Sequence, residues 1–114
     1  MGDPTQARII WDKSDGSCVE FPLASEIMVV GRDEQADIRI DEPLVSRFHA
    51  RVERRGKRFF LVDLGSTNST RVNGAIVSQQ ALEHGDELLF SRARCRFTLD
   101  TDPQDGPSEP GTKS

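Results

Sequence analysis

The stretch that decides the fold is residues 87–99, which read ELLFSRARCRFTL. It begins with a short apolar run, and it then alternates between arginine and small or apolar residues. Successive side chains of a β-strand point to opposite faces of a sheet, so this period of two predicts a strand. The arginines belong on its solvated face and the other residues in the core. The arginines are Arg92, Arg94 and Arg96, and the core residues are Ala93, Cys95, Phe97 and Leu99.

The rest of the chain is built in the same way, from short segments separated by turn residues. Asn73-Gly74 and Asp15-Gly16 each stand between two such segments. Both pairs favour a tight hairpin of type I′, because each of its two central residues requires positive φ. The expected strands are residues 7–11, 18–21, 27–30, 37–40, 49–54, 58–64, 71–72, 75–77, 87–90 and 92–99.

Ten or eleven short strands, with turns about every eight to twelve residues, are typical of an all-β, antiparallel β-sandwich. Residues 23–27 and 44–48 leave room for a helix of about two turns, and nothing longer is expected. From residue 100 onward Pro, Gly, Ser and Asp dominate, and no large apolar residue follows. We therefore expect one folded domain over residues 1–99 and a disordered linker or tail over residues 100–114.

Length and composition exclude several classes of protein. The 114 residues suffice for one domain, and no stretch approaches the roughly 20 apolar residues of a membrane-spanning helix. The first residues do not resemble a signal peptide, so we expect a cytoplasmic protein. We also expect it to be a monomer that does not bind a membrane. Cys18 and Cys95 are far apart and in no metal-ligand spacing, which predicts two buried thiols and no metal site.

The net charge of −4 is spread unevenly along the chain. Residues 100–114 contain four acids and one lysine, which leaves −1 for residues 1–99. A near-neutral domain without a dominant basic face argues against nucleic acid as the partner. A few arginines can still converge on a single anion.

Three expected loops are unusually rich in hydroxyl, amide and guanidinium groups. They are residues 31–32, 46–50 and 63–70. Alternate connections of a sandwich emerge at the same end, so these loops can meet in space. Arginine offers a rigid fork of donors that fits phosphate, and hydroxyls satisfy the remaining oxygens. An asparagine can both donate to and accept from a peptide unit, so the set suits a phosphate attached to a peptide.

Five short motifs follow one another along the chain: Gly31-Arg32, Ser46-Arg47-x-His49-Ala50, Asp63-Leu64-Gly65-Ser66-Thr67-Asn68-x-Thr70, Asn73-Gly74 and His84-Gly85-Asp86. In order and interval they resemble the motifs of forkhead-associated (FHA) domains, and the resemblance covers about residues 7–99. Any one motif is weak, but five in register are specific. The resemblance implies an eleven-stranded β-sandwich of the FHA/SMAD type whose loops at one end bind phosphothreonine.

The resemblance also implies a role for each binding residue. Arg32 and Ser46 contact the phosphate oxygens, and Thr67 makes a further phosphate or peptide contact. Arg47 adds a contact to the phosphate or to the peptide main chain. Asn68 hydrogen-bonds the peptide backbone beside the phosphothreonine. A small apolar niche for the threonine methyl group gives the preference over phosphoserine.

Other positions belong to the framework of the loops in such domains. Gly31 lets the chain turn closely, His49 braces the loop that carries Ser46, and the Asn73-Gly74 pair supports the loops. The family commonly has glycine after the asparagine, and this chain has Ser69. If that position needs positive φ, serine costs about 1 kcal/mol relative to glycine and reshapes the loop near Asn68.

The function expected on these grounds is phosphothreonine-dependent binding of a partner protein, downstream of a Ser/Thr kinase and without a cofactor. An alternative is a phosphate-independent scaffold or oligomerisation module. A third hypothesis is self-recognition through phosphorylated Thr5, Thr101 or Thr112 in polar segments. Ser46, His49 and Asp63 supply the residue types of a hydrolase triad, but no Gly-x-Ser-x-Gly elbow is present, so no enzyme is expected.

Overall fold

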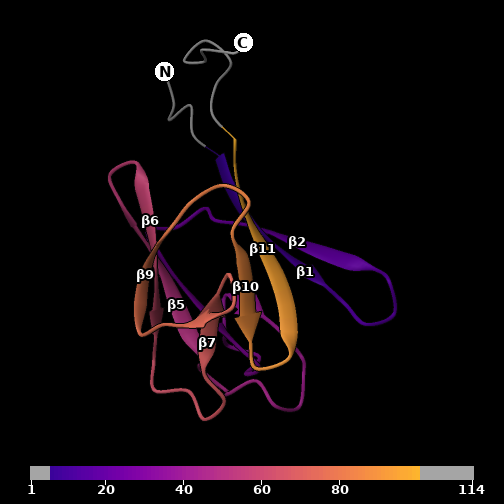
Figure 1. Ribbon diagram of the computed structural model, residues 1–114. Helices are drawn as coiled ribbons and strands as arrows, with labels where there is room; N and C mark the ends of the chain where they lie inside the picture. Colours follow the sequence, from indigo (N-terminus) through magenta and orange to yellow (C-terminus); the bar gives the residue numbers. More distant parts are fainter. Residues whose placement is uncertain (1–5, 101–114) are drawn as a thin grey trace.

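The computed structural model describes residues 6–100, and eleven β-strands make up its regular structure (Figure 1). They are β1 (Gln6–Asp12), β2 (Cys18–Pro22), β3 (Ile27–Gly31), β4 (Ile38–Arg39), β5 (Ala50–Arg55), β6 (Arg58–Asp63), β7 (Thr70–Val72), β8 (Ala75–Ile76), β9 (Gln79–Leu82), β10 (Glu87–Phe90) and β11 (Ala93–Asp100). The predicted all-β sandwich is therefore confirmed, and the strand count matches the eleven implied by the family resemblance.

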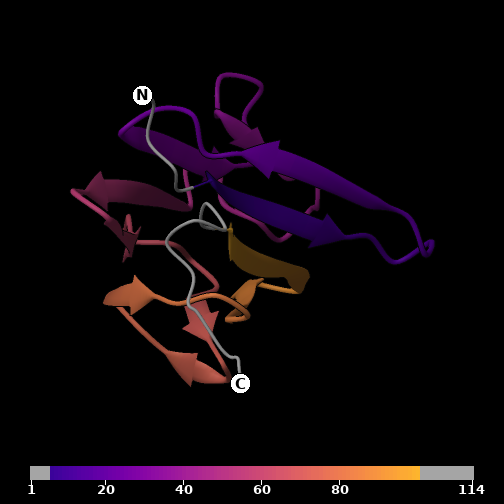
Figure 2. The ribbon, with the colours of Figure 1, turned by 90° about the horizontal axis from the view of Figure 1, so that it is seen from above.

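The strands form two sheets, which appear as two layers when the molecule is turned (Figure 2). The first has six strands in the order β2-β1-β11-β10-β7-β8, and the second has five in the order β4-β3-β5-β6-β9. All strand pairs are antiparallel except β3 and β4, which run parallel with Val30 opposite Ile38. The expected antiparallel sandwich thus contains one short parallel pair at a sheet edge.

The core lies between the two sheets and is filled by alternate residues of the strands. Phe59 of β6 and Phe97 of β11 pack across it with ring centroids 5.6 Å apart. In β11 the apolar side chains point inward and Arg94 and Arg96 are exposed, as the alternation predicts. The largest fully buried side chains are Phe59, Phe90, Phe97, Ile9, Ile38, Ile40, Leu61, Leu88, His49, Val30, Val45 and Thr70.

The two predicted hairpins exist, but only one has the predicted turn. Asn73 and Gly74 have φ of 52° and 88°, as a type I′ turn between β7 and β8 requires. In the β1–β2 hairpin only Gly16 has positive φ, 92°, and Asp15 does not. Asp15 instead accepts hydrogen bonds from the N–H and hydroxyl of Ser17, which supports a longer loop in place of the type I′ turn.

Other expectations from the sequence need correction. Residues 6–100 contain no helix, and so none that could span a membrane; residues 23–26 and 44–48 are irregular loop, and Ile27 begins β3. Cys95 is buried, but Cys18 is exposed because it lies on the outer face of β2, which makes the prediction of two buried thiols wrong. The expected disordered tail, apart from Asp100, lies outside the described residues, as do Thr5, Thr101 and Thr112.

The strand order brings three loops to one end of the sandwich. These are the β3–β4 loop (residues 32–37), the β4–β5 loop (residues 40–49) and the β6–β7 loop (residues 64–69). We call them the three loops. In Figure 1 they lie at the lower end of the molecule, opposite the end where β1 begins and β11 finishes.

Candidate functional site

Backbone hydrogen bonds hold the three loops against one another. The N–H of Arg32 donates to the carbonyl of Ser46 over 3.0 Å, and the N–H of Asp33 donates to that of Arg47 over 3.1 Å. The N–H of Leu64 donates to the carbonyl of His49 over 3.0 Å. These bonds fix the β4–β5 loop between the other two, so the side chains carried by all three are placed relative to one another.

Gly31 allows the β3–β4 and β4–β5 loops to approach closely. A Cβ at this position would lie 2.0 Å from the carbonyl oxygen of Arg47 and 3.0 Å from the Cα of Phe48. Its φ is not positive, so glycine is required here by the closeness of the neighbouring backbone and not by a left-handed conformation. The sequence predicted that the chain turns closely at Gly31, and the structure shows that the backbone of Arg47 and Phe48 lies against it.

His49 links the β4–β5 loop to the β6–β7 loop from inside the protein. It is fully buried, and its Nδ1 accepts the N–H of Ser46 over 3.1 Å. Because Nδ1 accepts, Nε2 carries the proton, and it donates to the carbonyl of Ser69 over 2.8 Å. The ring also meets Phe90 edge-on at 5.6 Å. Both ring nitrogens are thus occupied by loop backbone.

The Ser46 hydroxyl is oriented by the neighbouring loop. Its Oγ accepts the backbone N–H of Thr67 over 3.1 Å. A hydroxyl has one proton to donate, and accepting this bond leaves that proton available to a ligand. Ser46 is half-buried and Thr67 is exposed, so the ligand would approach from solvent. The structure therefore brings Ser46 and Thr67 together, as the motif spacing suggested.

The guanidinium of Arg32 is fixed in part by the residue that precedes Ser46. Its Nε donates to the carbonyl of Val45 over 3.0 Å. Its two terminal nitrogens have no hydrogen-bond partner within residues 6–100, and the side chain is exposed. One bond to the backbone orients the guanidinium plane, and the remaining donors face solvent where a tetrahedral anion would fit.

Arg47 is placed differently from Arg32. Its Nε and Nη2 both reach Oδ2 of Asp33, at 3.1 and 2.9 Å. Asp33 also accepts the N–H of Gln35, and this bond together with the Arg47 contact lowers the pKa of its carboxyl below the usual value. Arg47 is exposed on the rim of the site and is already paired, so a ligand contact would require it to share or leave Asp33.

Asn68 and Ser69 are the last two residues of the β6–β7 loop, directly before β7. The Asn68 side chain donates from Nδ2 to the carbonyl of Leu44 over 2.9 Å, which leaves its Oδ1 for a ligand. Ser69 has a φ of 72°, in the left-handed region that favours glycine. The position that is commonly glycine in the family thus has a positive φ here, and Ser69 adopts it.

Two further residues, Asp63 and Arg39, support the site although the sequence assigned neither of them a role in it. Asp63 accepts four hydrogen bonds, from the N–H groups of Gly65 and Ser66 at 2.9 and 3.0 Å and from the hydroxyls of Ser66 and Thr70 at 2.5 and 2.7 Å. Burial raises the pKa of this carboxyl, but these bonds outweigh burial and the net pKa lies below its usual value.

Arg39 is the second overlooked residue. Its Nε donates to the carbonyl of Arg32 over 3.2 Å, which adds a second positive charge beside Arg32. The signal for Asp63 was its spacing from the hydroxyls three and seven residues later. Arg39 carried no signal, because it lies in a two-residue strand whose pairing is not visible in the sequence.

Asn73 and Gly74 lie away from these contacts. The Asn73 side chain donates to Asp86 over 3.0 Å and accepts the N–H of Glu87 over 2.9 Å, which fastens the β7–β8 turn to the start of β10. No hydrogen bond within residues 6–100 joins Asn73 to the three loops. Its support of the binding loops stays a prediction, and any such support would act through β7 and β10.

The end of the sandwich thus presents a hydroxyl with a proton to donate, a guanidinium with one nitrogen bound to backbone, and an asparagine whose amide nitrogen is bound to a backbone carbonyl. These are Ser46, Arg32 and Asn68, and hydrogen bonds connect their loops directly. The ring nitrogens of His49 are engaged by backbone groups, and Asp63 binds Ser66 and Thr70. The arrangement can bind a tetrahedral anion and an adjoining peptide unit.

Comparisons with known proteins agree with this geometry. The FHA domain family model matches residues 28–91. A solved structure from work on phosphothreonine-dependent FHA domain interactions is similar with a TM-score of 0.74 and 28% identity, covering 82% of this chain and 95% of that chain.

Two longer relatives are similar in sequence. The glycogen accumulation regulator GarA of Mycobacterium tuberculosis is 32% identical over 109 residues, which is 96% of this chain and 66% of GarA. The human proliferation marker protein Ki-67 is 34% identical over 95 residues, which is 82% of this chain but 3% of Ki-67. This chain thus spans a small part of Ki-67 and 66% of GarA.

Proposed function

This chain belongs to the FHA domain family, and from that premise we propose that the end formed by the three loops binds a phosphothreonine segment of a partner protein. In this proposal the domain is a signalling adaptor that acts after a Ser/Thr kinase has modified the partner. The family and the solved structures similar to this chain favour this reading over a phosphate-independent scaffold.

The observation that carries the proposal is the hydrogen bond from the Thr67 N–H to Ser46 Oγ, 3.1 Å long, beside the half-fixed guanidinium of Arg32. The bond orients a hydroxyl whose own proton is free to donate, and Arg32 supplies positive charge next to it. A phosphothreonine brings close to two negative charges and three acceptor oxygens. The side chains are therefore oriented before the ligand arrives, so binding loses less conformational entropy.

The adjoining peptide is held by amide and main-chain contacts in this proposal. Asn68 has its Nδ2 on the carbonyl of Leu44, so its Oδ1 accepts a peptide N–H beside the phosphothreonine. Arg47 adds a contact when it turns from Asp33 toward the phosphate, and Thr67 contacts the phosphate or peptide. Hydrogen bonds to charged groups contribute about 1.5–3 kcal/mol each. Three or four of them, less ordering costs, give roughly micromolar affinity.

We also propose a role, a compartment and an oligomeric state for the domain. GarA is by name a regulator of glycogen accumulation, and we assign this chain a regulatory binding role without catalysis or cofactor. We place it in the cytoplasm, as a monomer that binds neither nucleic acid nor membrane. A longer protein containing this chain would gain a phosphorylation-dependent attachment point.

The test is calorimetric titration with a phosphothreonine peptide, its unphosphorylated twin and its phosphoserine analogue. The phosphothreonine peptide should bind best. Arg32→Ala and Ser46→Ala should each weaken that binding at least about tenfold, or roughly 1.4 kcal/mol. Arg58→Ala is the matched control, because Arg58 is an exposed arginine at the start of β6, the opposite end of that strand from the three loops.

Two outcomes would contradict the proposal. Equal affinity for the phosphorylated and unphosphorylated peptides would favour the scaffold alternative. Full binding by folded Arg32→Ala and Ser46→Ala variants would place the phosphate elsewhere. Circular dichroism and the unfolding midpoint of each variant show that a loss of binding is not a loss of fold.

A further inference from the structure

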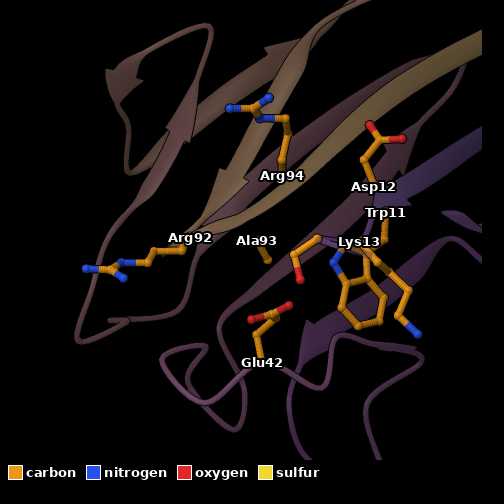
Figure 3. A pocket seen from close by; sticks show the side chains of 8 residues that line it. Trp11, Asp12, Lys13, Glu42, Arg92, Ala93 and Arg94 are labelled. Carbon is orange, nitrogen blue, oxygen red and sulfur yellow. The ribbon is translucent and has the colours of Figure 1, made fainter. Parts of the chain in front are cut away.

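A second hollow lies beside the three loops, where β1 and the β10–β11 turn meet the β4–β5 loop. Its volume is about 400 Å³. Figure 3 shows it from close by. Its lining residues are Trp11, Asp12, Lys13, Ser14, Glu42, Arg92, Ala93 and Arg94.

Trp11 brings a buried hydrogen-bond donor to this hollow. The side chain is 6% exposed, and its Nε1 is buried without an acceptor among the described residues. In Figure 3 the nitrogen lies on the edge of the ring that faces Glu42. A buried indole N–H usually has a partner, because leaving it unpaired costs about 1–3 kcal/mol. A ligand that accepts this bond would recover that free energy.

Glu42 brings an acceptor to the same place. Its half-buried side chain makes no hydrogen bond or ion pair within residues 6–100. The other acid, Asp12, is already satisfied, since Arg96 donates to both of its oxygens at 2.9 and 3.0 Å. In Figure 3 Arg92 and Arg94 extend away from the centre of the hollow. The hollow therefore offers the indole N–H as a donor and the Glu42 carboxylate as an acceptor, and the Ser14 hydroxyl also belongs to its lining.

A chain of neighbouring residues leads from the hollow to Asn68 of the candidate phosphothreonine site. A neighbouring hollow of about 340 Å³ is lined by Glu42, Pro43, Leu44 and Arg92, so it shares Glu42 and Arg92 with the first. The carbonyl of Leu44 accepts the side-chain amide of Asn68 over 2.9 Å. An extended peptide held at Asn68 can thus pass over Leu44 toward Trp11, at about 3.3 Å per residue.

We propose that the hollow between Trp11 and Glu42 takes the side-chain carboxamide of an asparagine or glutamine in the phosphopeptide. The carboxamide oxygen accepts the Trp11 N–H, and its NH₂ group donates to the Glu42 carboxylate. This inference rests on the proposed function and deepens it, because it names a residue preference that accompanies the phosphothreonine.

Charged and apolar side chains satisfy only part of the site. A carboxylate accepts the indole N–H but faces the negative charge of Glu42. A lysine or arginine pairs with Glu42 but leaves the indole N–H without an acceptor, and Lys13 lies nearby with its Nζ 5.1 Å from the Trp11 ring centroid. An apolar side chain leaves both groups unpaired. A hydroxyl also accepts and donates, but through a single oxygen, whereas a carboxamide accepts and donates through two separate atoms.

The test uses phosphothreonine peptides in which glutamine, glutamate or leucine is placed in turn at each flanking position. At one position glutamine should bind about tenfold more tightly than glutamate and about fivefold more tightly than leucine, as expected for two hydrogen bonds. Glu42→Gln should reduce the preference over glutamate to about twofold, because the repelling charge is gone. Glu83→Gln, at an exposed acid between β9 and β10, is the matched control and should leave the preference unchanged.

Trp11 supplies a readout that does not depend on any variant folding. It is the single tryptophan of the chain, so its indole N–H gives one NMR resonance. That resonance should shift with the preferred glutamine peptide and not with its leucine twin. Trp11→Phe, which removes the N–H and keeps an aromatic ring, should abolish the preference for glutamine over leucine.

The outcomes separate this inference from the proposed function. Phosphate-dependent binding without a glutamine preference and without an indole shift overturns the inference and leaves the proposed function intact. An equal indole shift with every phosphopeptide means that a main-chain peptide unit fills the hollow, which overturns the side-chain assignment. No binding of any phosphopeptide overturns the proposed function and this inference with it.

Discussion

Replacing Gly31 by alanine tests whether the three loops depend on close backbone contact. An added Cβ would lie 2.0 Å from the Arg47 carbonyl oxygen and 2.7 Å from the Arg47 carbonyl carbon. Backbone atoms cannot rotate aside as a flexible side chain does. To reach even 3.0 Å, the β4–β5 loop has to move by about 1 Å away from β3.

The magnitude follows from what that movement disturbs. The Arg32 N–H to Ser46 carbonyl bond is 3.0 Å long and the Asp33 N–H to Arg47 carbonyl bond is 3.1 Å long, so a shift of about 1 Å breaks both. Each lost bond costs about 1 kcal/mol and the overpacking costs about 1–3 kcal/mol. We expect Gly31→Ala to lower the free energy of unfolding by about 3–5 kcal/mol and to weaken phosphopeptide binding at least tenfold.

The assay combines urea unfolding with peptide titration on the same preparation. Gly16→Ala is the control, because Gly16 has a φ of 92° but no atom within 4 Å of an added Cβ. It should cost only about 1 kcal/mol for the left-handed conformation and leave peptide binding unchanged. A Gly31→Ala variant with wild-type stability and wild-type binding would show that the three loops do not depend on the close backbone contact at Gly31.

Three further predictions concern the supports of the loops. His49→Ala should lower the free energy of unfolding by about 3 kcal/mol in urea unfolding, because it leaves the Ser46 N–H unpaired, removes one of the two hydrogen bonds to the Ser69 carbonyl and opens a cavity; a cost below about 1 kcal/mol would contradict it. Ser69→Gly should raise the free energy of unfolding by up to about 1 kcal/mol, because the φ of 72° suits glycine. A clear decrease in the free energy of unfolding would contradict this. Asp63→Asn should cost about 2 kcal/mol at pH 7. Hydrogen bonds hold the folded-state pKa of Asp63 below the ordinary value of an aspartate despite its burial. Its stabilisation is therefore present above that ordinary value, about 3.9, and is lost as pH falls, so the difference from wild type should shrink below about pH 4.

Local patterns in the sequence predicted ten of the eleven strands and missed β9 (Gln79–Leu82). The alternation in residues 92–99 placed Arg94 and Arg96 outside and Phe97 inside, because side-chain direction in a strand depends only on position. Asn73-Gly74 gave the correct turn type as well as the hairpin. In each case the information lies within a few neighbouring residues.

Features set by distant contacts were not predictable in the same way. The β3–β4 pair is two residues long and parallel, and no local pattern announces such a pairing. Asp15-Gly16 forms a hairpin with another turn, since the Asp15 carboxylate binds Ser17 and stabilises a longer loop. Cys18 faces solvent because β2 pairs only with β1 and its outer face is uncovered.

The candidate site shows the same division. The motif spacing predicted Arg32, Ser46, Thr67 and Asn68 as binding residues. The structure places their loops in contact. Sequence alone did not show that Arg47 pairs with Asp33, because that contact depends on how two loops fold against each other. Nor did it show the buried N–H of Trp11, which depends on packing around β1.

Binding of phosphothreonine by the three loops can be tested by NMR chemical-shift mapping with a phosphothreonine peptide and its unphosphorylated twin at equal concentration. We expect the largest differences between the two spectra at Arg32, Ser46 and Thr67. Equal spectra with both peptides, or differences centred on the outer faces of the two sheets, would contradict it.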